Sequence, residues 1–145
     1  EIDNTRIIIS LKDKEGKYSL RISNAAVKEI YTYKAIIERV KDGDTMVVNV
    51  DCGFGTYVEQ TLRLRGIDAP ELRTAGREKA KKFVQEEISK CPFIIIKTYK
   101  SDKYDRYLVD VFYDAALTDP AQVAAKGRLL NYELLKSGLA IKWKP

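Results

Sequence analysis

Apolar and polar positions alternate through the middle of this chain in short runs that are typical of β-strands. The longest run covers 56–67, where Val58, Leu62 and Leu64 alternate with polar residues. Turn sequences rich in Gly, Asp and Pro separate the runs and mark where strands end. We therefore expect five strands, at 33–41, 45–51, 56–67, 93–99 and 106–113.

Two segments have the apolar spacing of a helix with one buried face. The first covers about 75–90 and ends before Pro92. The second covers about 128–137 and ends at Gly138, a residue type that favours the position after a helix. The Ala-rich stretch 114–127 is predicted to be a connection without regular structure.

The strand and helix order predicts a fold class. Five strands with a helix between the third and fourth is the order of an OB-fold barrel, so we expect a mainly β (α+β) chain. Runs at 5–11 and 17–22 flank a turn sequence and predict a separate hairpin, followed by a short helix at 23–30. The expected organisation is an N-terminal extension over 1–30 and a barrel domain over 31–145.

Composition narrows the chemistry. The chain has 145 residues, of which 45% are hydrophobic and 32% are charged, as in ordinary globular proteins. No apolar run approaches the roughly 20 residues of a membrane span, so we expect no membrane association. Histidine is absent, which excludes histidine bases and histidine metal ligands. The 26 basic against 21 acidic residues give a net charge of +5 and favour a polyanionic partner.

Two cysteines and two aromatic residues are expected to have structural roles. Cys52 and Cys91 form no metal-binding pair. A disulfide between them stays open, and two buried free thiols are the favoured interpretation. Tyr132 and Trp143 are expected to complete the core rather than to stack on a ligand.

The first candidate site is the sequence Asp42-Gly43-Asp44-Thr45, between two predicted strands. On an extended backbone Asp42 and Asp44 point the same way, and Gly43 permits a tight turn. With the Thr45 hydroxyl, they offer hard oxygen ligands that suit Ca²⁺ or Mg²⁺. The alternative is a hairpin turn without a ligand.

The second candidate site is formed by Arg63, Asp68 and Glu71 at the end of the long predicted strand. Asp68 suits a metal, Glu71 suits proton transfer from water, and the planar Arg63 guanidinium suits a phosphate. The alternative is a helix start in which Asp68 is the cap and Glu71 favours the helix dipole.

The third candidate site is the segment 102–106, where Lys103, Tyr104 and Arg106 lie close together. Arg106 suits a phosphate, and Tyr104 suits a sugar, base or phosphate. The alternative is an exposed β-turn rich in charge.

Four motifs in a fixed order support a functional interpretation of the three candidate sites. They are DGDT at 42–45, RLRGIDAPE at 63–71, DKYDR at 102–106 and LNYELLKSGLA at 130–140. In this order they resemble the staphylococcal nuclease (thermonuclease) family, over about three quarters of the chain. The family's fold is a five-stranded OB barrel with helices, in agreement with the pattern above.

The resemblance implies one calcium ion. Its implied ligands are the Asp44 and Asp68 carboxylates and the backbone carbonyl of Ala69, with Asp42 in the nearby acidic set. Mg²⁺ or Mn²⁺ are expected substitutes. The residue in the position of the family's general base is Glu71.

The resemblance also implies a substrate site. Arg63 and Arg106 correspond to the family's phosphate-binding arginines, and Lys103 and Tyr104 to its substrate lysine and tyrosine. Asp105 replaces the family's glycine, so its carboxylate is expected to weaken the hold of Arg106 on phosphate. The lysine-rich loop of the family prototype is shortened, and its last helix has no counterpart.

The implied function is metal-dependent hydrolysis of single-stranded or frayed DNA and RNA with low sequence specificity. The products would carry 3′-phosphate ends. The resemblance also suggests a monomer and a secreted or cell-surface location. Two alternatives remain open: an inactive OB-fold module that binds nucleic acid or protein, and a structural domain whose N-terminal hairpin docks a partner.

Overall fold

The computed structural model describes residues 7–23, 31–70 and 75–144. Contacts divide the chain into two compact units, Glu1–Tyr31 and Thr32–Pro145. In the first unit, β1 (Ile7–Lys12) and β2 (Tyr18–Ser23) form the predicted antiparallel hairpin. The helix predicted at 23–30 lies outside the described residues, except Ser23, which ends β2.

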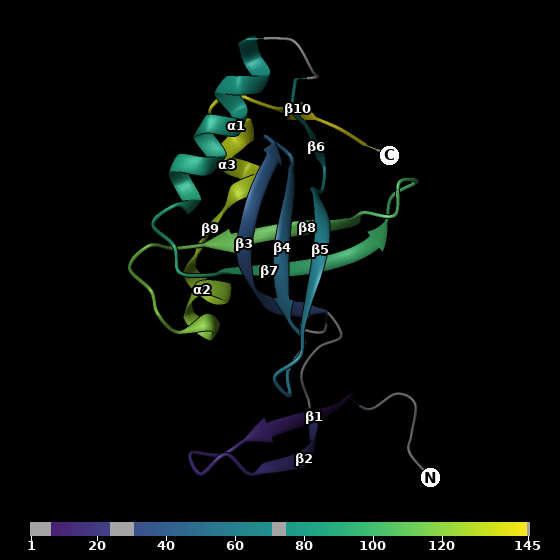
Figure 1. Cartoon of the computed structure of the whole chain (residues 1–145), viewed down its shortest axis with the longest axis vertical. Coiled ribbons are helices and arrows are strands. Elements are labelled where there is room, and N and C mark those ends of the chain that lie inside the picture. Colours follow the sequence, from purple (N-terminus) through teal and green to yellow (C-terminus); the bar gives the residue numbers. More distant parts are fainter. Residues whose placement is uncertain (1–6, 24–30, 71–74, 145) are drawn as a thin grey trace. The chain divides into compact units, whose positions relative to one another are not determined.

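The second unit contains a closed barrel of five strands (Figure 1). The strands follow the order β5-β4-β3-β7-β8 with antiparallel neighbours, and a parallel pairing between β5 and β8 closes the ring. The bounds are β3 (Thr32–Asp42), β4 (Thr45–Asp51), β5 (Tyr57–Leu64), β7 (Ile94–Ser101) and β8 (Tyr107–Tyr113). The predicted α+β OB-type barrel is therefore confirmed.

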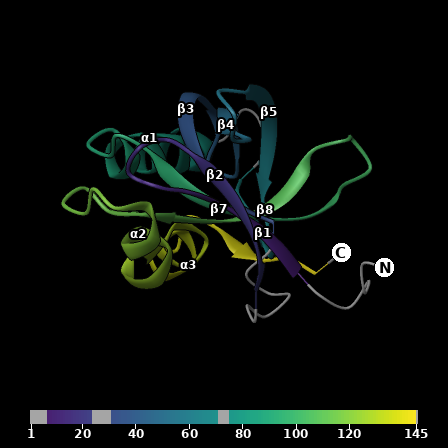
Figure 2. The ribbon, with the colours of Figure 1, turned by 90° about the horizontal axis from the view of Figure 1, so that it is seen from below.

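Alternation along the strands fills the barrel interior. The fully buried side chains of the core include Met46, Leu62, Ile96, Val109 and Leu134. The three helices of the described residues lie on one flank of the barrel, opposite the loop between β7 and β8 (Figures 1 and 2). None of the helices in the described part of the chain is long and apolar enough to cross a membrane.

The predicted long strand at 56–67 is interrupted. It divides into β5 and the short strand β6 (Ile67–Asp68), which pairs with β10 (Ile141–Lys142). Gly66 lies between them with a φ of 74°, a left-handed conformation that glycine adopts at little cost. The turn ends β5 and leads into β6, which carries Asp68.

Helix prediction was partly wrong. Helix α1 (Ala75–Ile88) matches the expectation, but α2 (Pro120–Lys126) lies in the predicted connection. Its start is a recognisable signal, because the Asp119 side chain accepts the Ala121 N–H and proline occupies the first helical position. The segment predicted as one helix at 128–137 begins with β9 (Arg128–Leu129) and continues as α3 (Leu130–Lys136).

Three side chains expected in the interior are at the surface instead. Tyr132 is 56% exposed, because it lies across α3 from the buried Leu130 and Leu134. Trp143 follows β10 and is 39% exposed. Cys52 begins a turn and is exposed, and both cysteines are free thiols.

A buried amide braces the closure of the barrel. Asn131, on α3, is 5% exposed. Its Oδ1 accepts the Val111 N–H at 3.1 Å, and its Nδ2 donates to the carbonyl oxygens of Arg65 and Val109 at 3.0 Å. These bonds satisfy main-chain groups where β5 ends beside β8, so one side chain links the helix to both strands.

We expect Asn131→Leu to lower the free energy of unfolding by about 2 kcal/mol or more, because the buried Val111 N–H would lose this acceptor and the Arg65 and Val109 carbonyls would each lose one bond. Chemical denaturation measures this value. Tyr132→Leu is the matched control, since the neighbouring side chain is exposed and its change should stay within about 0.5 kcal/mol. Equal losses in both variants would contradict a bracing role for Asn131.

Candidate functional site

The turn between β3 and β4 separates two carboxylates that the sequence analysis grouped. Asp42 pairs with Thr45 across a tight turn of Gly43 and Asp44. Asp44 is therefore a turn residue, and strand alternation does not apply to it. Asp42 binds Arg77 on α1 at 2.5 Å, whereas Asp44 points into the protein. The expectation that the two carboxylates point the same way is wrong.

Gly43 has a different role from the predicted one. Its φ lies outside the left-handed region, so the turn itself does not require glycine. A Cβ at this position would lie 2.6 Å from the Cβ of Ala80 and 3.2 Å from that of Ala69. Glycine therefore permits the close approach of α1 to the turn that carries Asp44.

Asp44 is a buried carboxylate whose oxygens are satisfied. The residue is 5% exposed. Oδ1 accepts the Thr45 hydroxyl at 2.9 Å, and Oδ2 accepts the Ala69 N–H at 2.8 Å. Oδ2 also forms an ion pair with Arg63. The main chain of Ala69 thus lies beside Asp44, as the resemblance implied, although a ligand role for its carbonyl stays a prediction.

Arg63 joins the two candidate metal carboxylates. One terminal nitrogen contacts Asp44, and the other donates to Asp68 Oδ1 at 2.7 Å. Only 12% of the Arg63 side chain is exposed, against 41% for Asp68. Burial alone would lower the pKa of Arg63, but the bonds and charges of the two carboxylates outweigh it and raise the pKa above its ordinary value. A permanently charged guanidinium therefore bridges both carboxylates.

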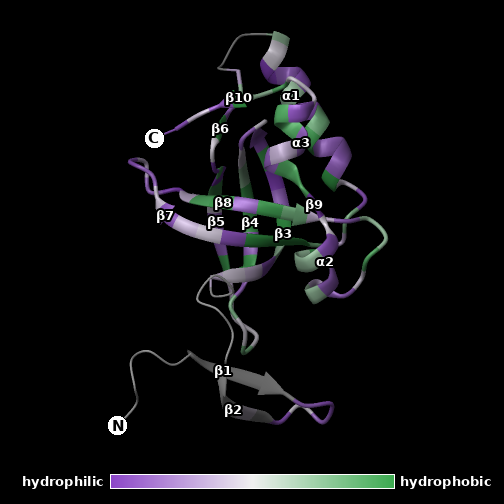
Figure 3. Ribbon diagram, turned by 180° about the vertical axis from the view of Figure 1, so that it is seen from behind, coloured by the Kyte–Doolittle hydropathy of each residue, from purple (hydrophilic) through white to green (hydrophobic). Residues whose placement is uncertain are grey.

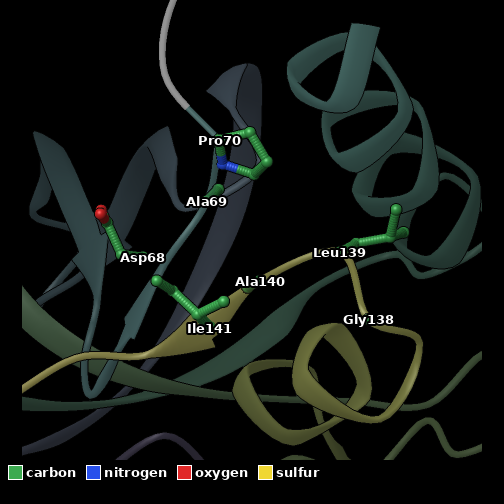
Figure 4. A pocket seen from close by; sticks show the side chains of 7 residues that line it. All are labelled: Asp68, Ala69, Pro70, Gly138, Leu139, Ala140 and Ile141. Carbon is green, nitrogen blue, oxygen red and sulfur yellow. The ribbon is translucent and has the colours of Figure 1, made fainter. Parts of the chain in front are cut away.

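The rim beside Asp68 is open rather than enclosed. A cavity of about 170 Å³ lies between residues 68–70 and 138–141 (Figure 4). That volume is below the 300–1,000 Å³ typical of small-molecule pockets, so a larger ligand would have to lie across the surface. Glu71 follows Pro70 but lies outside the described residues, and its predicted role as a base stays a prediction.

The loop between β7 and β8 is a tight turn that positions Arg106. The Asp105 N–H donates to the Asp102 carbonyl at 3.1 Å, and Asp105 has a φ of 59°. Asp102 Oδ2 accepts from Arg106 Nε at 2.8 Å and forms an ion pair with Nη2 at 2.7 Å. The carboxylate that holds Arg106 is therefore Asp102, and the expected weakening of phosphate binding by Asp105 stays a prediction.

Tyr104 projects from the same loop. It is 67% exposed. The ring lies 5.0 Å from the Lys103 ammonium and 5.1 Å from the Arg106 guanidinium. An exposed aromatic ring between two cations suits a ligand with both a flat group and a negative charge.

The parallel pairing of β5 and β8 brings the second and third candidate sites together. Leu62 pairs with Tyr107, and Arg63 pairs with Leu108. Arg106 directly precedes this ladder, so it lies beside the strand that carries Arg63. Arg63 and Arg106 therefore lie near the same end of the pairing between β5 and β8.

The structure thus joins most of the predicted site and adds two residues. It unites Asp44, Arg63, Asp68 and the Ala69 main chain, with the 102–106 loop alongside. Asp42 is turned toward α1 by Arg77. In the described part of the chain, no three His, Cys, Asp or Glu side chains form a metal-binding cluster. Sequence reasoning assigned no role to Arg77 or Asp102.

These features define a closed OB-type barrel with an arginine and carboxylate site on its rim. A family model described as staphylococcal nuclease homologue matches residues 61–144, more than half of the chain, and the chain therefore belongs to this family. The match includes Arg63, Asp68, Glu71 and the 102–106 loop, while Asp44 lies before it. A comparison with curated proteins gives no match.

The pairing of Asp102 with Arg106 predicts a measurable titration. Burial raises the pKa of Asp102, but bonds from Arg106 and Tyr104 outweigh it and hold the pKa below the ordinary 3.8. The stability from this contact is therefore present above pH 3.8 and is lost as the pH falls through the depressed value. NMR titration of the Tyr104 and Arg106 amides should show a midpoint below 3.8.

Arg106→Gln tests whether the contact with Arg106 causes the lowered pKa of Asp102. Removing the cation should move the midpoint upward toward 3.8, while Lys82→Gln, on the exposed face of α1, should leave it unchanged. A midpoint unaffected by Arg106→Gln would contradict the ion pair as the cause.

Proposed function

We propose that this chain is a metal-dependent phosphodiesterase that hydrolyses DNA and RNA with low sequence specificity. The observation that supports the proposal best is the Arg63 guanidinium, which bridges Asp44 and Asp68 beside Arg106. The family membership supports the same class of reaction. Acids, arginines and an open rim together suit a phosphodiester inside a long polymer.

The arginines supply the phosphate contacts. Arg63 and Arg106 each offer a planar set of donors that matches two phosphate oxygens. Both terminal nitrogens of Arg63 bind carboxylates, so a phosphate that takes both would replace these contacts. Arg106 binds Asp102 through Nε and Nη2, so a phosphate can approach it from the Nη1 side. Preorganised donors of this kind stabilise the charge that grows on the phosphoryl oxygens in the transition state.

The donor set fits a single divalent cation. Asp44 and Asp68 present oxygens to one guanidinium, so both lie within reach of one ion once Arg63 moves to the phosphate. Oxygen ligands suit Ca²⁺, with Mg²⁺ or Mn²⁺ as substitutes. Such an ion would polarise a phosphoryl oxygen. With two carboxylates in the described set, we expect weak binding, with Kd about 10⁻⁴–10⁻³ M.

Glu71 is proposed as the general base. Its carboxylate takes a proton from water as the water oxygen attacks phosphorus. The bond from phosphorus to the 5′-oxygen breaks, and the leaving oxygen gains a proton from solvent. The products are a 3′-phosphate end and a 5′-hydroxyl end.

The open rim favours a flexible substrate. A single-stranded or frayed strand can lay its backbone across the surface, with a base or sugar against Tyr104 and a phosphate near Lys103. None of these contacts reads base edges, which accounts for the low specificity proposed. We propose that the monomer is the active form.

Cleavage of a quenched fluorescent single-stranded DNA oligonucleotide tests the proposal. We expect turnover with Ca²⁺ and none with EDTA. Glu71→Gln should lower kcat by about 10²–10⁴-fold, as expected for the loss of a general base. Arg63→Ala and Arg106→Ala should each lower it by about 10²–10³-fold, because each removes a donor to the transition state.

Lys82→Gln controls for the loss of one surface cation and should retain full turnover, since 76% of this side chain is exposed on α1. Turnover by Glu71→Gln at the normal rate would refute the base assignment. Binding of the oligonucleotide without cleavage under any metal would instead assign the chain to the inactive, nucleic-acid-binding alternative.

Thermal unfolding tests the metal site without catalysis. If Kd is near 1 mM, Ca²⁺ at about 10 mM should raise the Tm by a few degrees, because it binds only the folded state. Asp68→Asn should abolish the rise, while Glu86→Gln, a matched acid on the exposed face of α1, should keep it. An equal rise in both variants would show that calcium binds elsewhere.

A further inference from the structure

Three residues form an ordered cluster on the outer wall of the barrel, apart from the proposed catalytic residues. The Arg65 guanidinium lies 4.1 Å from the centroid of the Tyr99 ring. Its Nε and Nη2 bind the two oxygens of Asp110 at 3.1 and 2.9 Å. The Tyr99 hydroxyl donates to Asp110 Oδ2 at 2.9 Å. We call Arg65, Tyr99 and Asp110 the Arg65 platform.

The plane of the guanidinium is fixed while much of it stays accessible. One face lies against Tyr99 and one edge is bound to Asp110. The main chain is also held, because the Arg65 N–H donates to the Val109 carbonyl at 2.9 Å and the Arg65 carbonyl accepts from Asn131. Even so, 47% of the Arg65 side chain is exposed. Neither contact covers the side of the guanidinium that is directed away from Tyr99.

The platform lies next to the proposed phosphate site. Arg63 and Arg65 are two residues apart and share the outer face of the strand end, while Leu62 and Leu64 fill the core. Residues at this spacing on a strand lie about 6.7 Å apart. Lys97, which pairs with Asp110 on the neighbouring strand, adds a cation. In Figure 3 a hydrophilic band crosses β8 and continues over β7.

We propose that the Arg65 platform is a base-stacking subsite for the nucleotide next to the phosphate at Arg63. The inference rests on the proposed function and extends it to a second contact with the single strand. Nucleobases stack on guanidinium planes as they do on aromatic rings. Every base has such a face, so this contact adds affinity without reading sequence.

A base fits the platform better than a phosphate does. Asp110, itself held by Tyr99, occupies the Nε and Nη2 edge of Arg65, so a phosphate could use only the remaining Nη hydrogens, next to the Asp110 charge. A base needs only the exposed face and breaks none of these bonds. The contacts that fix the plane also reduce the side-chain entropy lost when a base stacks on it.

The test compares the binding of two single-stranded oligonucleotides of equal length and charge, one with bases and one fully abasic, by fluorescence anisotropy in EDTA. The readout is the ratio of the abasic Kd to the base-bearing Kd. Arg65→Lys keeps the charge and removes the plane, so the ratio should fall by about fivefold to 100-fold. Lys82→Arg, the matched cation exchange on α1, should leave the ratio unchanged.

Asp110→Asn provides a second variant with a distinct signature. It removes a negative charge, so binding of the abasic strand should strengthen. It also releases the edge of Arg65 from its carboxylate, so the ratio should fall. Thermal unfolding establishes that each variant is folded before its ratio is used.

An unchanged ratio in folded Arg65→Lys would overturn the subsite. If both strands lost affinity equally, the unchanged ratio would also mean that Arg65 contacts phosphate. Cleavage by the wild-type chain together with an unchanged ratio would leave the proposed function intact. A wild-type chain that neither cleaves nor binds would overturn the proposed function itself.

Discussion

The parallel pairing of β5 with β8 is the constraint on which the site depends. Three residue pairs, Leu62 with Tyr107 through Leu64 with Val109, close the barrel and fix the register between two strands far apart in sequence. This register brings Arg63 on β5 and Arg106, which directly precedes β8, to the same end of the pairing. The Asn131 amide completes the closure from α3, since it binds the main chain of both strands where the ladder ends. The strand pairing that closes the barrel therefore also brings the residues of the site together.

The three arginines near the pairing of β5 with β8 each have a carboxylate partner within the chain. The pairs are Arg63 with Asp44 and Asp68, Arg65 with Asp110, and Arg106 with Asp102. These contacts hold planar cations in fixed positions, at the cost that an anionic ligand must compete for the same donors. The competition is strongest at Arg63, which is the most buried of the three. Phosphate binding at Arg63 is therefore favourable only if another cation neutralises Asp44 and Asp68.

The barrel could be predicted from the sequence because alternation in the middle strands has a period of two, and α1 because its apolar spacing is helical. Asp119 and Pro120 signalled α2, but the Ala-rich composition around them was interpreted as a connection. The sequence predicted which residues belong to the site, but it did not predict which of them are in contact. Asp44 turns inward because it occupies a turn, where alternation fails, and Arg77 draws Asp42 away. The Asp102 contact with Arg106 depends on a loop conformation in which Asp105 takes a positive φ, which local sequence patterns do not specify.

Arg63 has two roles in the proposed function, and the two are linked. It neutralises Asp44 and Asp68 in the structure, and in the proposed reaction it binds the phosphate. A cation that replaces the guanidinium at the carboxylates therefore favours phosphate binding, and by reciprocity a bound phosphate favours that cation. Lysine at this position would supply one charge but no planar pair of donors, so it could not bridge two carboxylates and then two phosphate oxygens with the same geometry. The requirement for arginine thus follows from the exchange between two partners as much as from the phosphate itself.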